Sequence, residues 1–377
     1  MKRIYLDNAA TTQMDVEVIE AMSDLMKETY GNPSSTHSYG REARAAIEKA
    51  RRKVAGFIKA SPAEVLFTSG GTEADNMAIM CSVRDLGVKH IITSAIEHHA
   101  VLHTVHALEK EEKVCVSFVR LTPNGHVDMN HLEELMRLQG PTLVSLMHAN
   151  NEIGNLCDLK QISSLCRAYG AYFHSDTVQT MAHYPINLQE LDIDFITCSA
   201  HKFHGPKGVG FLYVNSNVRI QPLLFGGAQE RNMRGGTENI YGIVGLAKAI
   251  EIAHDRMAEH HEHIAALKIY MIEKLRQIIP DVQFNGDAEG NSLYTVLNVN
   301  FPDSPISEML LFNLDIMGIS ASGGSACSSG SSVGSHVLAA INGNSTRPAV
   351  RFSFGKFNTK AEIDVVISGL KELFFSK

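Results

Sequence analysis

Short apolar runs that alternate with amphipathic helical patterns extend over the first 215 residues and limit the folds open to this chain. Segments 41–59, 130–138 and 159–169 repeat apolar residues at helical spacing. The runs themselves, at 4–6, 65–68, 90–93, 115–119, 143–147, 171–174, 195–198 and 210–214, are rich in β-branched and aromatic residues. Strands that alternate with helices form a mostly parallel sheet with helices on both faces. We therefore predict an α/β fold, with its site at one edge of the sheet.

The rest of the chain predicts a second, smaller unit. A chain of 377 residues, 44% of them hydrophobic, is long enough for two domains with a large buried core. A long helical pattern over about residues 243–279 predicts a bridge into a C-terminal α/β domain that starts near His260. Strands at 294–299 and 350–354 are expected in this smaller domain.

Charge and hydropathy exclude some classes of function. The formal net charge of -7 disfavours nucleic acid as the primary ligand, because nucleic-acid binding usually needs a basic surface. Charged residues and histidines interrupt the longest helical pattern, so we expect no membrane span. The N-terminus enters a strand at once and has no apolar signal core, so we expect a cytoplasmic location.

Lys202 and Asp176 are the two residues that most strongly suggest chemistry. Lys202 follows the predicted strand 195–198 and lies among small residues, where a lysine held away from water can react with a carbonyl group. Asp176 ends an earlier strand and can pair with a pyridinium nitrogen. A lysine for the aldehyde and a carboxylate for the ring nitrogen describe a pyridoxal 5′-phosphate (PLP) site. The alternative is a surface lysine in a turn and an aspartate that caps a helix.

A glycine turn upstream supplies the expected phosphate site. Strand 65–68 leads through Gly70 and Gly71 to Thr72 and a helical pattern, so backbone N–H groups and a hydroxyl can converge on an anion. Ser199 and His201, near the lysine, can donate to the same phosphate. His98 follows another short strand and can lie over a planar ring; its alternative is a core histidine.

Six cysteines lie scattered along the chain, without the spacing of a zinc site or a disulfide framework. The first five, at 81, 115, 157, 166 and 198, are interpreted as buried thiols within apolar patterns. Cys327 differs, because it lies in a tract of glycine and serine from 320 to 334 with little to bury. A thiol in such a tract can enter a site and leave it again; the alternative is an incidental cysteine in a linker.

Taken together, motifs along the chain resemble the cysteine desulfurases of the NifS/IscS type, in the class V aminotransferase family. They are Tyr5-Leu-Asp-Asn-Ala-Ala-Thr-Thr12, Gly31-Asn-Pro-Ser34, Ser69-Gly-Gly-Thr72, Asn150-Asn-Glu-Ile-Gly154, His201-Lys202, Arg234-Gly-Gly-Thr237, Ser322-Gly-Gly-Ser-Ala-Cys327 and Arg351-Phe-Ser-Phe-Gly355. The resemblance extends from the first strand to Gly355.

This resemblance implies a PLP-dependent transferase of fold type I that acts as a homodimer. It implies a large PLP-binding domain at 15–258 and a small domain formed by 1–14 and 259–377. It further implies that L-cysteine is converted to L-alanine and that Cys327 takes up the sulfur as a persulfide, for iron-sulfur cluster assembly or another sulfur-transfer pathway. A sulfur-acceptor protein is expected, and its identity stays open.

Residue roles follow from the positions of the same motifs. Lys202 would bind the PLP aldehyde and move the Cα proton, and Asp176 would hold the ring nitrogen. Asn151 and Gln179 would bond the ring hydroxyl, and His98 would stack on the ring. The phosphate would be held by Gly71, Thr72, Ser199 and His201, with Thr237 coming from the partner subunit. Arg351 and Asn32 would bind the substrate carboxylate, although Arg351 also suits a structural ion pair.

Other functions stay open at this level. One is a different PLP enzyme of the same fold, such as a selenocysteine lyase or an aminotransferase, and the Cys327 tract disfavours the aminotransferase. Another is a metal-dependent protein that uses His174 and Asp176 with His201 or His204, although the glycine turn then has no role. Gly71 stands where the family often has alanine, a change expected to leave the phosphate donors intact.

Overall fold

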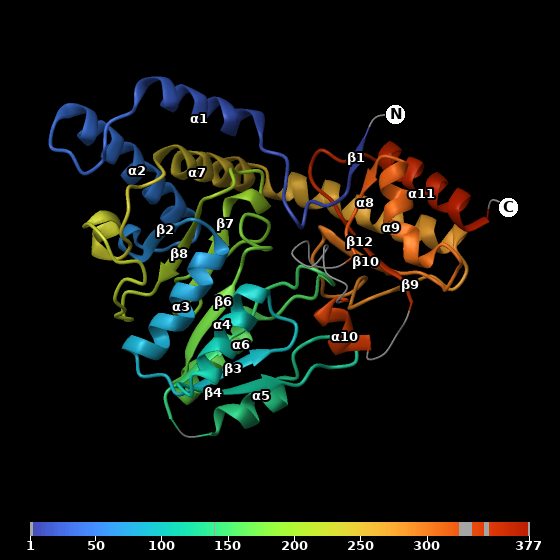
Figure 1. Ribbon diagram of the computed structural model, residues 1–377, viewed down its shortest axis with the longest axis horizontal. Coiled ribbons are helices and arrows are strands. Elements are labelled where there is room, and N and C mark those ends of the chain that lie inside the picture. The colour runs from blue at the N-terminus through green and yellow to red at the C-terminus, as the bar shows by residue number, and fades with distance from the viewer. Residues whose placement is uncertain (1–2, 139, 324–333, 343–346, 376–377) are drawn as a thin grey trace.

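A seven-stranded sheet forms the centre of the larger part of the molecule (Figure 1). The computed structural model describes residues 3–138, 140–323, 334–342 and 347–375. The strand order is β2 (Val65–Thr68), β8 (Gly210–Val214), β7 (Phe195–Ser199), β6 (Tyr172–Asp176), β5 (Thr142–Ser145), β3 (His90–Ser94) and β4 (Cys115–Val119). Neighbours from β7 to β4 run parallel, whereas β8 is antiparallel to β7 and β2. The predicted α/β fold with a mostly parallel sheet is confirmed.

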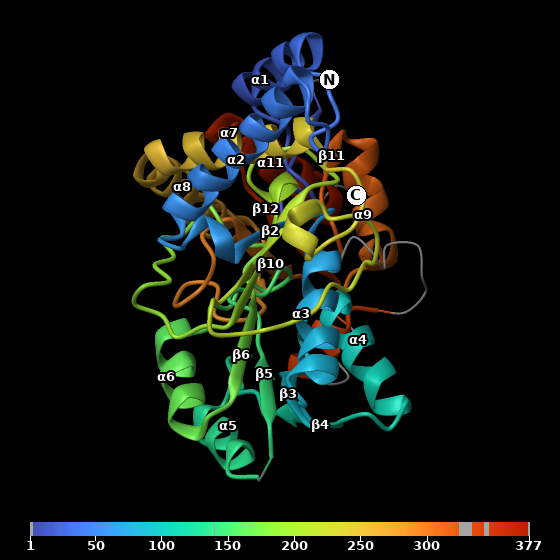
Figure 2. The same cartoon turned by 90° about the vertical axis from the view of Figure 1, so that its left-hand side faces the viewer.

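Helices cover both faces of this sheet, as Figure 2 shows. On one face lie α3 (Gly71–Asp85) and α4 (His99–Lys110); α5 (Met129–Met136) and α6 (Leu159–Tyr169) lie on the other. The second face also packs against α1 (Val16–Glu28), α2 (Ser38–Phe57) and α7 (Ile240–Asp255). Strands β2, β3, β5, β7 and β8 are buried along their whole length, because both faces are covered.

The C-terminal part has its own hydrophobic core. An antiparallel sheet of β12 (Ala349–Ser353), β10 (Val296–Asn300) and β9 (Gln283–Phe284) packs with α8 (Met257–Ile278), α9 (Leu310–Ile316) and α11 (Lys360–Phe375). The N-terminal strand β1 (Ile4–Tyr5) pairs with β11 (Ile319–Ser320) and so lies beside this part (Figure 1). Helix α10 (His336–Asn342) and the short helices η1 (Pro62–Glu64), η2 (Ala200–Lys202), η3 (Gln229–Asn232) and η4 (Ser307–Met309) complete the described elements. The domain boundary at 258/259 stays a prediction.

The predicted continuous helix over 243–279 is wrong, because the chain breaks it at Arg256. The backbone of Arg256 has φ -118° and ψ 18°, outside the helical region, and separates α7 from α8. No glycine or proline stands at the break, so the sequence carried no signal for it. No helix among the described residues is long and apolar enough to cross a membrane.

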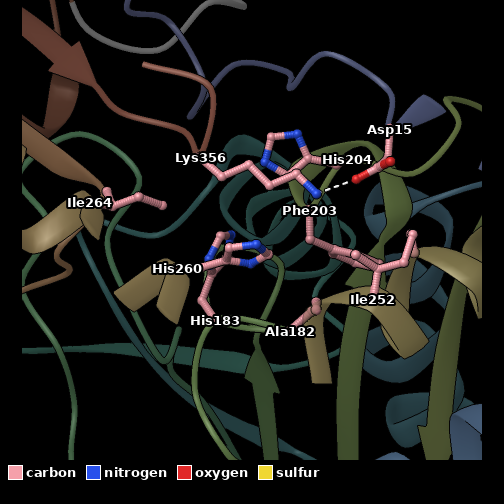
Figure 3. A pocket seen from close by; sticks show the side chains of 11 residues that line it. Asp15, Ala182, His183, Phe203, His204, Ile252, His260, Ile264 and Lys356 are labelled. Atoms are coloured by element: carbon pink, nitrogen blue, oxygen red, sulfur yellow. Dashed lines mark hydrogen bonds and ion pairs between the residues drawn. The ribbon is translucent and has the colours of Figure 1, made fainter. Parts of the chain in front are cut away.

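A small cavity of about 20 Å³ is lined by residues of both α7 and α8, among them Ile252 and His260 (Figure 3). His183, His204 and His260 line it, together with the ion pair between Lys356 and Asp15. His183 also contacts the carbonyl of Lys202 through Nε2, at 3.3 Å. His183 therefore connects the cavity between the two hydrophobic cores to the backbone of Lys202.

Candidate active site

Most of the predicted site residues lie together at the carboxyl ends of the parallel strands. Asp176 and Ser199 end β6 and β7, and Asn151 follows β5 in the loop. A cavity of about 470 Å³ opens at this edge. Ten of the predicted residues line it: Gly71, Thr72, His98, Asn151, Asp176, Gln179, Ser199, His201, Lys202 and Arg351. The fold thus gathers side chains that are up to 280 residues apart in the sequence, from Gly71 to Arg351.

The turn after β2 forms one end of the cavity. Gly70 has φ +154°, and Gly71 begins α3, so the first N–H groups of the helix face the cavity edge. A Cβ atom on Gly71 would lie 2.8 Å from Cγ2 of Val178, and one on Gly70 would lie 3.5 Å from the Ser199 hydroxyl. Close approach of the turn to β7 and to Val178 therefore places the donors where an anion fits.

Lys202 lines the cavity from η2, which directly follows β7. Its Nζ donates to the carbonyl oxygens of Ala9 at 2.7 Å and Ala10 at 2.8 Å. Gln179 donates from Nε2 to the same Ala9 carbonyl at 3.0 Å. The N-terminal segment therefore positions both side chains, which the sequence alone did not indicate.

The opposite end of the cavity is acidic and buried. Asp176 is 7% exposed and accepts a hydrogen bond from the Val178 backbone at 2.9 Å. Burial, and then the neighbouring Asp75, raise the pKa of Asp176 to about 6. Burial lowers the pKa of His98, whose Nδ1 accepts from the Ala100 backbone at the start of α4. A group that brings a positive charge to this end would stabilise the carboxylate of Asp176.

His201 precedes the lysine on η2 and also lines the cavity. Burial, and then the charges of Lys202 and Lys207, lower the pKa of His201 to about 4. Its Nδ1 lies 3.1 Å from the hydroxyl of Thr11. The imidazole is therefore neutral at pH 7, and an anion beside it would raise its pKa again.

These two ends fit PLP. The donors at the start of α3 suit its phosphate, and the buried carboxylate suits a protonated ring nitrogen, with an amine between them for the aldehyde. Sequence reasoning missed Asp75, which also lines the cavity. The only signal for it was an acidic residue between the apolar positions Ala74 and Met77 of α3.

Arg351 is buried in β12 at the edge of the cavity. Nη2 donates to Asp7 at 2.8 Å, and Nη1 donates to the carbonyl of Asn151 at 3.0 Å. Nε has no hydrogen-bond partner among the described residues. The structural ion pair weighed from the sequence therefore exists, while the guanidinium also lines the cavity with donors that these two bonds do not use.

Two predicted site residues, Asn32 and Thr237, do not line this cavity. Asn32 is exposed in the loop between α1 and α2 and accepts from the Ser34 backbone. Thr237 lines a neighbouring cavity of about 160 Å³ with Ser69 and Gly208. Cys327 lies outside the described residues.

The interpretation of the first five cysteines as buried thiols is wrong for two of them. Cys81, Cys166 and Cys198 are buried, whereas Cys157 is half-buried and Cys115 is exposed on β4. β4 is an edge strand with a less covered surface, which its apolar sequence did not reveal.

The metal site considered as an alternative, with His174 and Asp176 as two ligands, lacks its expected third ligand among the described residues. His174 faces Asp75, His201 contacts Thr11, and Nδ1 of His204 donates to the Gln13 carbonyl at 2.8 Å. Asp176 instead lies with Asp75 and His98. The set of His174 and Asp176 with His201 or His204 is therefore not assembled.

Comparison with known proteins identifies the family. The model of the aminotransferase class-V family matches residues 4–366. A curated relative from Dictyoglomus turgidum, the cysteine desulfurase IscS, is 45% identical over 99% of this chain and 95% of its own length. A solved NifS-like protein is 36% identical with a TM-score of 0.91, over 99% of both chains. A structure described as SspA in complex with cysteine is 30% identical with a TM-score of 0.81, over 95% of this chain and all of that one. The chain therefore belongs to the class-V aminotransferase family, among the PLP-dependent cysteine desulfurases of the NifS/IscS type.

Proposed function

We propose that the enzyme converts L-cysteine to L-alanine and transfers the sulfur to Cys327. The observation that carries the proposal is one cavity lined by the donors at the start of α3, by the buried carboxylate of Asp176 and by Lys202. When bound, PLP supplies an aldehyde for the substrate amine and a ring that withdraws electrons from Cα. Its position would be held by Thr72, Ser199 and His201 at the phosphate, with Gly71 leaving room, and by Asp176 at the ring nitrogen.

Lys202 would act as the base and acid at the substrate carbons. Its Nζ, held by the carbonyls of Ala9 and Ala10, would remove the Cα proton and return it. His98 would lie on one face of the ring, and burial lowers its pKa, so its imidazole is neutral at pH 7. Asn151 and Gln179 would bond the ring hydroxyl.

Arg351 would bind the substrate carboxylate. A guanidinium has five N–H donors, and the bonds to Asp7 and Asn151 account for two of them. The substrate carboxylate and the carboxylate of Asp7 would therefore both bind the guanidinium of Arg351. Asn32 does not line the cavity, so its role at this carboxylate stays a prediction.

The sulfur transfer itself needs a thiolate. The Cys327 thiolate would form a bond to the substrate sulfur while the bond from that sulfur to Cβ breaks. The electron pair of the broken bond stays on Cβ. Cβ then takes up a proton and becomes the methyl group of the alanine that is released. One cysteine and one thiol thus give one alanine and one persulfide, without an outside oxidant.

A homodimer is part of the proposal. Tyr30, Tyr39, Leu224 and Phe225 are large apolar side chains with exposures of 69%, 49%, 42% and 81%. Exposed side chains of this kind favour a protein interface. In such a dimer Thr237 would reach the partner's phosphate site. A sulfur-acceptor protein, a role in iron-sulfur cluster assembly and a cytoplasmic location likewise stay predictions.

The proposal is tested by following the sulfur. With L-cysteine, the wild type should release alanine and carry one extra sulfur on Cys327, detected by mass spectrometry of peptides. Cys327→Ala should bind L-cysteine and form no persulfide. The matched control is Cys115→Ala, which removes the exposed cysteine of β4 and should behave as the wild type. Persulfide found mainly on one of the other five cysteines would contradict the proposal.

A further inference from the structure

A second carboxyl group, Asp75, lies beside Asp176 at the acidic end of the cavity. It is on the second turn of α3 and is 1% exposed. One oxygen of Asp75, one of Asp176 and a ring nitrogen of His98 all lie within 4.8 Å of one another. Two carboxyl groups are therefore buried where the ring nitrogen of PLP would lie.

The surroundings of Asp75 supply little positive charge. β6 presents Asp176 and His174, β7 presents Thr197, and the residues before α4 present Glu97 and His98. Burial raises the pKa of Glu97 well above its usual value, and Asp75 contributes to that shift. Two carboxylates this close do not both ionise readily unless a cation joins them. The ring nitrogen is the cation that this end of the cavity is shaped to receive.

His174 is a close polar neighbour of Asp75, although neither Nε2 of His174 nor Oδ1 of Asp75 has a hydrogen-bond partner among the described residues. Its Nδ1 lies 2.8 Å from the Ser145 hydroxyl, and its Nε2 lies 3.4 Å from Oδ1 of Asp75. Burial lowers the pKa of His174 to about 4, so the ring is neutral at pH 7. When Ser145 donates to Nδ1, the hydrogen of the neutral ring is on Nε2, the ring nitrogen nearer to Asp75.

We propose that Asp75 is a positioning residue of the ring-nitrogen site, whose ionised carboxylate acts beside Asp176 to keep the ring nitrogen of PLP protonated. The inference rests on the proposed function and deepens it, because it adds a second charge to the electron-sink end of the cofactor.

The effect should depend on pH with a defined sign. Burial raises the pKa of Asp75 to about 7, so its charge is absent in acid and present in base. Its contribution to ring protonation is therefore lost as the pH falls through that pKa. Binding of the cationic ring would shift the transition to lower pH.

The test compares the wild-type holoenzyme with Asp75→Asn, both loaded with PLP labelled with nitrogen-15 in the ring. Nitrogen-15 NMR reports protonation of the ring nitrogen between about pH 5 and pH 9. The wild type should keep the ring nitrogen protonated to a pH at least about one unit higher than the variant, because charges about 5 Å apart interact strongly in a buried site. PLP dissociation should be about tenfold faster in the variant at the basic end and equal at the acidic end.

Asp85→Asn is the matched control, because it removes a carboxylate from the other end of the same helix, where Asp85 pairs with Arg84. It should leave the ring titration unchanged. Identical ring titrations in the wild type and Asp75→Asn would overturn the inference. A wild type that retains no PLP would contradict the proposed function instead, so the two failures are distinguishable.

A second variant decides the case in which Asp75→Asn does not fold. Asp75→Ser also removes the carboxyl group and leaves a smaller polar side chain in the buried site. Its ring nitrogen should lose its proton at a lower pH than that of the wild type, as in Asp75→Asn. A ring titration identical to that of the wild type would overturn the inference.

Discussion

Lys202 illustrates how far a single side chain depends on segments distant in the sequence. Its amine is held by the carbonyls of Ala9 and Ala10, almost two hundred residues earlier. Another lysine, Lys207, also lines the cavity but is exposed. The two side chains have the same amine, and they differ in their surroundings, because backbone carbonyls hold Lys202 whereas Lys207 is exposed to solvent.

At the residue scale we expect Lys202→Ala to lose turnover of L-cysteine by a factor on the order of 10² to 10⁴ or more, because the base at Cα is removed. The visible absorbance of covalently held PLP should disappear, while the circular dichroism spectrum should stay that of the wild type. Lys207→Ala, the neighbouring control, should keep both the absorbance and most of the activity. Wild-type turnover by Lys202→Ala would rule out its assignment.

At the element scale, the contact between the start of α3 and the turn after β6 is the most sensitive to side-chain volume. Gly71 stands where the family often has alanine, and in this chain the side chain of Val178 packs against that position. The Cβ of an alanine would lie 2.8 Å from Cγ2 of Val178, whose β-branched side chain has few rotamers to escape into.

Gly71→Ala should therefore destabilise the protein by about 1 to 3 kcal/mol, the usual cost of overpacking a tight contact, and should weaken PLP binding. The double variant with Val178→Ala should recover most of both losses, because it removes the atom that clashes. The free energy of unfolding of the four proteins of this cycle measures the coupling. Additive effects of the two substitutions would show that the contact does not limit the turn.

At the scale of the whole molecule, the proposed dimer makes each active site depend on two chains. Thr237 lines a cavity together with Ser69 of its own chain. Thr237 could therefore bind the PLP phosphate of its own chain or that of the partner subunit. Mixing Lys202→Ala with Thr237→Asp distinguishes these two cases, since a carboxylate at 237 should repel the phosphate. Each variant alone should be inactive.

With a shared site, one site of the mixed dimer collects both substitutions and the other has intact Lys202 and Thr237, so activity should reappear. If Thr237 served its own chain, both sites would stay damaged. Subunit exchange is monitored by mass spectrometry of the intact dimers. Exchange without recovered activity, or a fully active monomer, would contradict the shared site.

The junction between the two cores should be sensitive to acid. His204, which lines the cavity of Figure 3, is 7% exposed, and burial lowers its pKa to about 3. Below its unfolded pKa of about 6.5 the unfolded chain binds the proton more tightly than the folded chain, so stability falls as the pH falls. At pH 5 the loss attributable to His204 should be about 2 kcal/mol.

Urea unfolding of the PLP-saturated protein at pH 7 and pH 5 measures this loss. His204→Asn can still donate to the Gln13 carbonyl but does not titrate, so its stability should change less between the two pH values. An equal change in both proteins would show that His204 does not carry the acid sensitivity.

The sequence by itself determined most of the elements and indicated the residues proposed to react. Alternation of β-branched runs with helical patterns is a local signal, so strands such as β2, β4 and β8 and helix α6 lie where the pattern predicts them. The glycine turn, Asp176 and Lys202 are also local signals, because each follows a strand. Their family resemblance added roles that spacing alone left open.

Only the tertiary structure decided which groups meet. The break at Arg256, the pairing of Arg351 with Asp7 and the exposure of Cys115 depend on what packs against each residue, and no local pattern records that. Asp75 is the clearest case, since an aspartate in the second turn of a helix is ordinarily exposed. It is buried here because α3 lies flat on the sheet, and this packing brings its carboxyl group to Asp176.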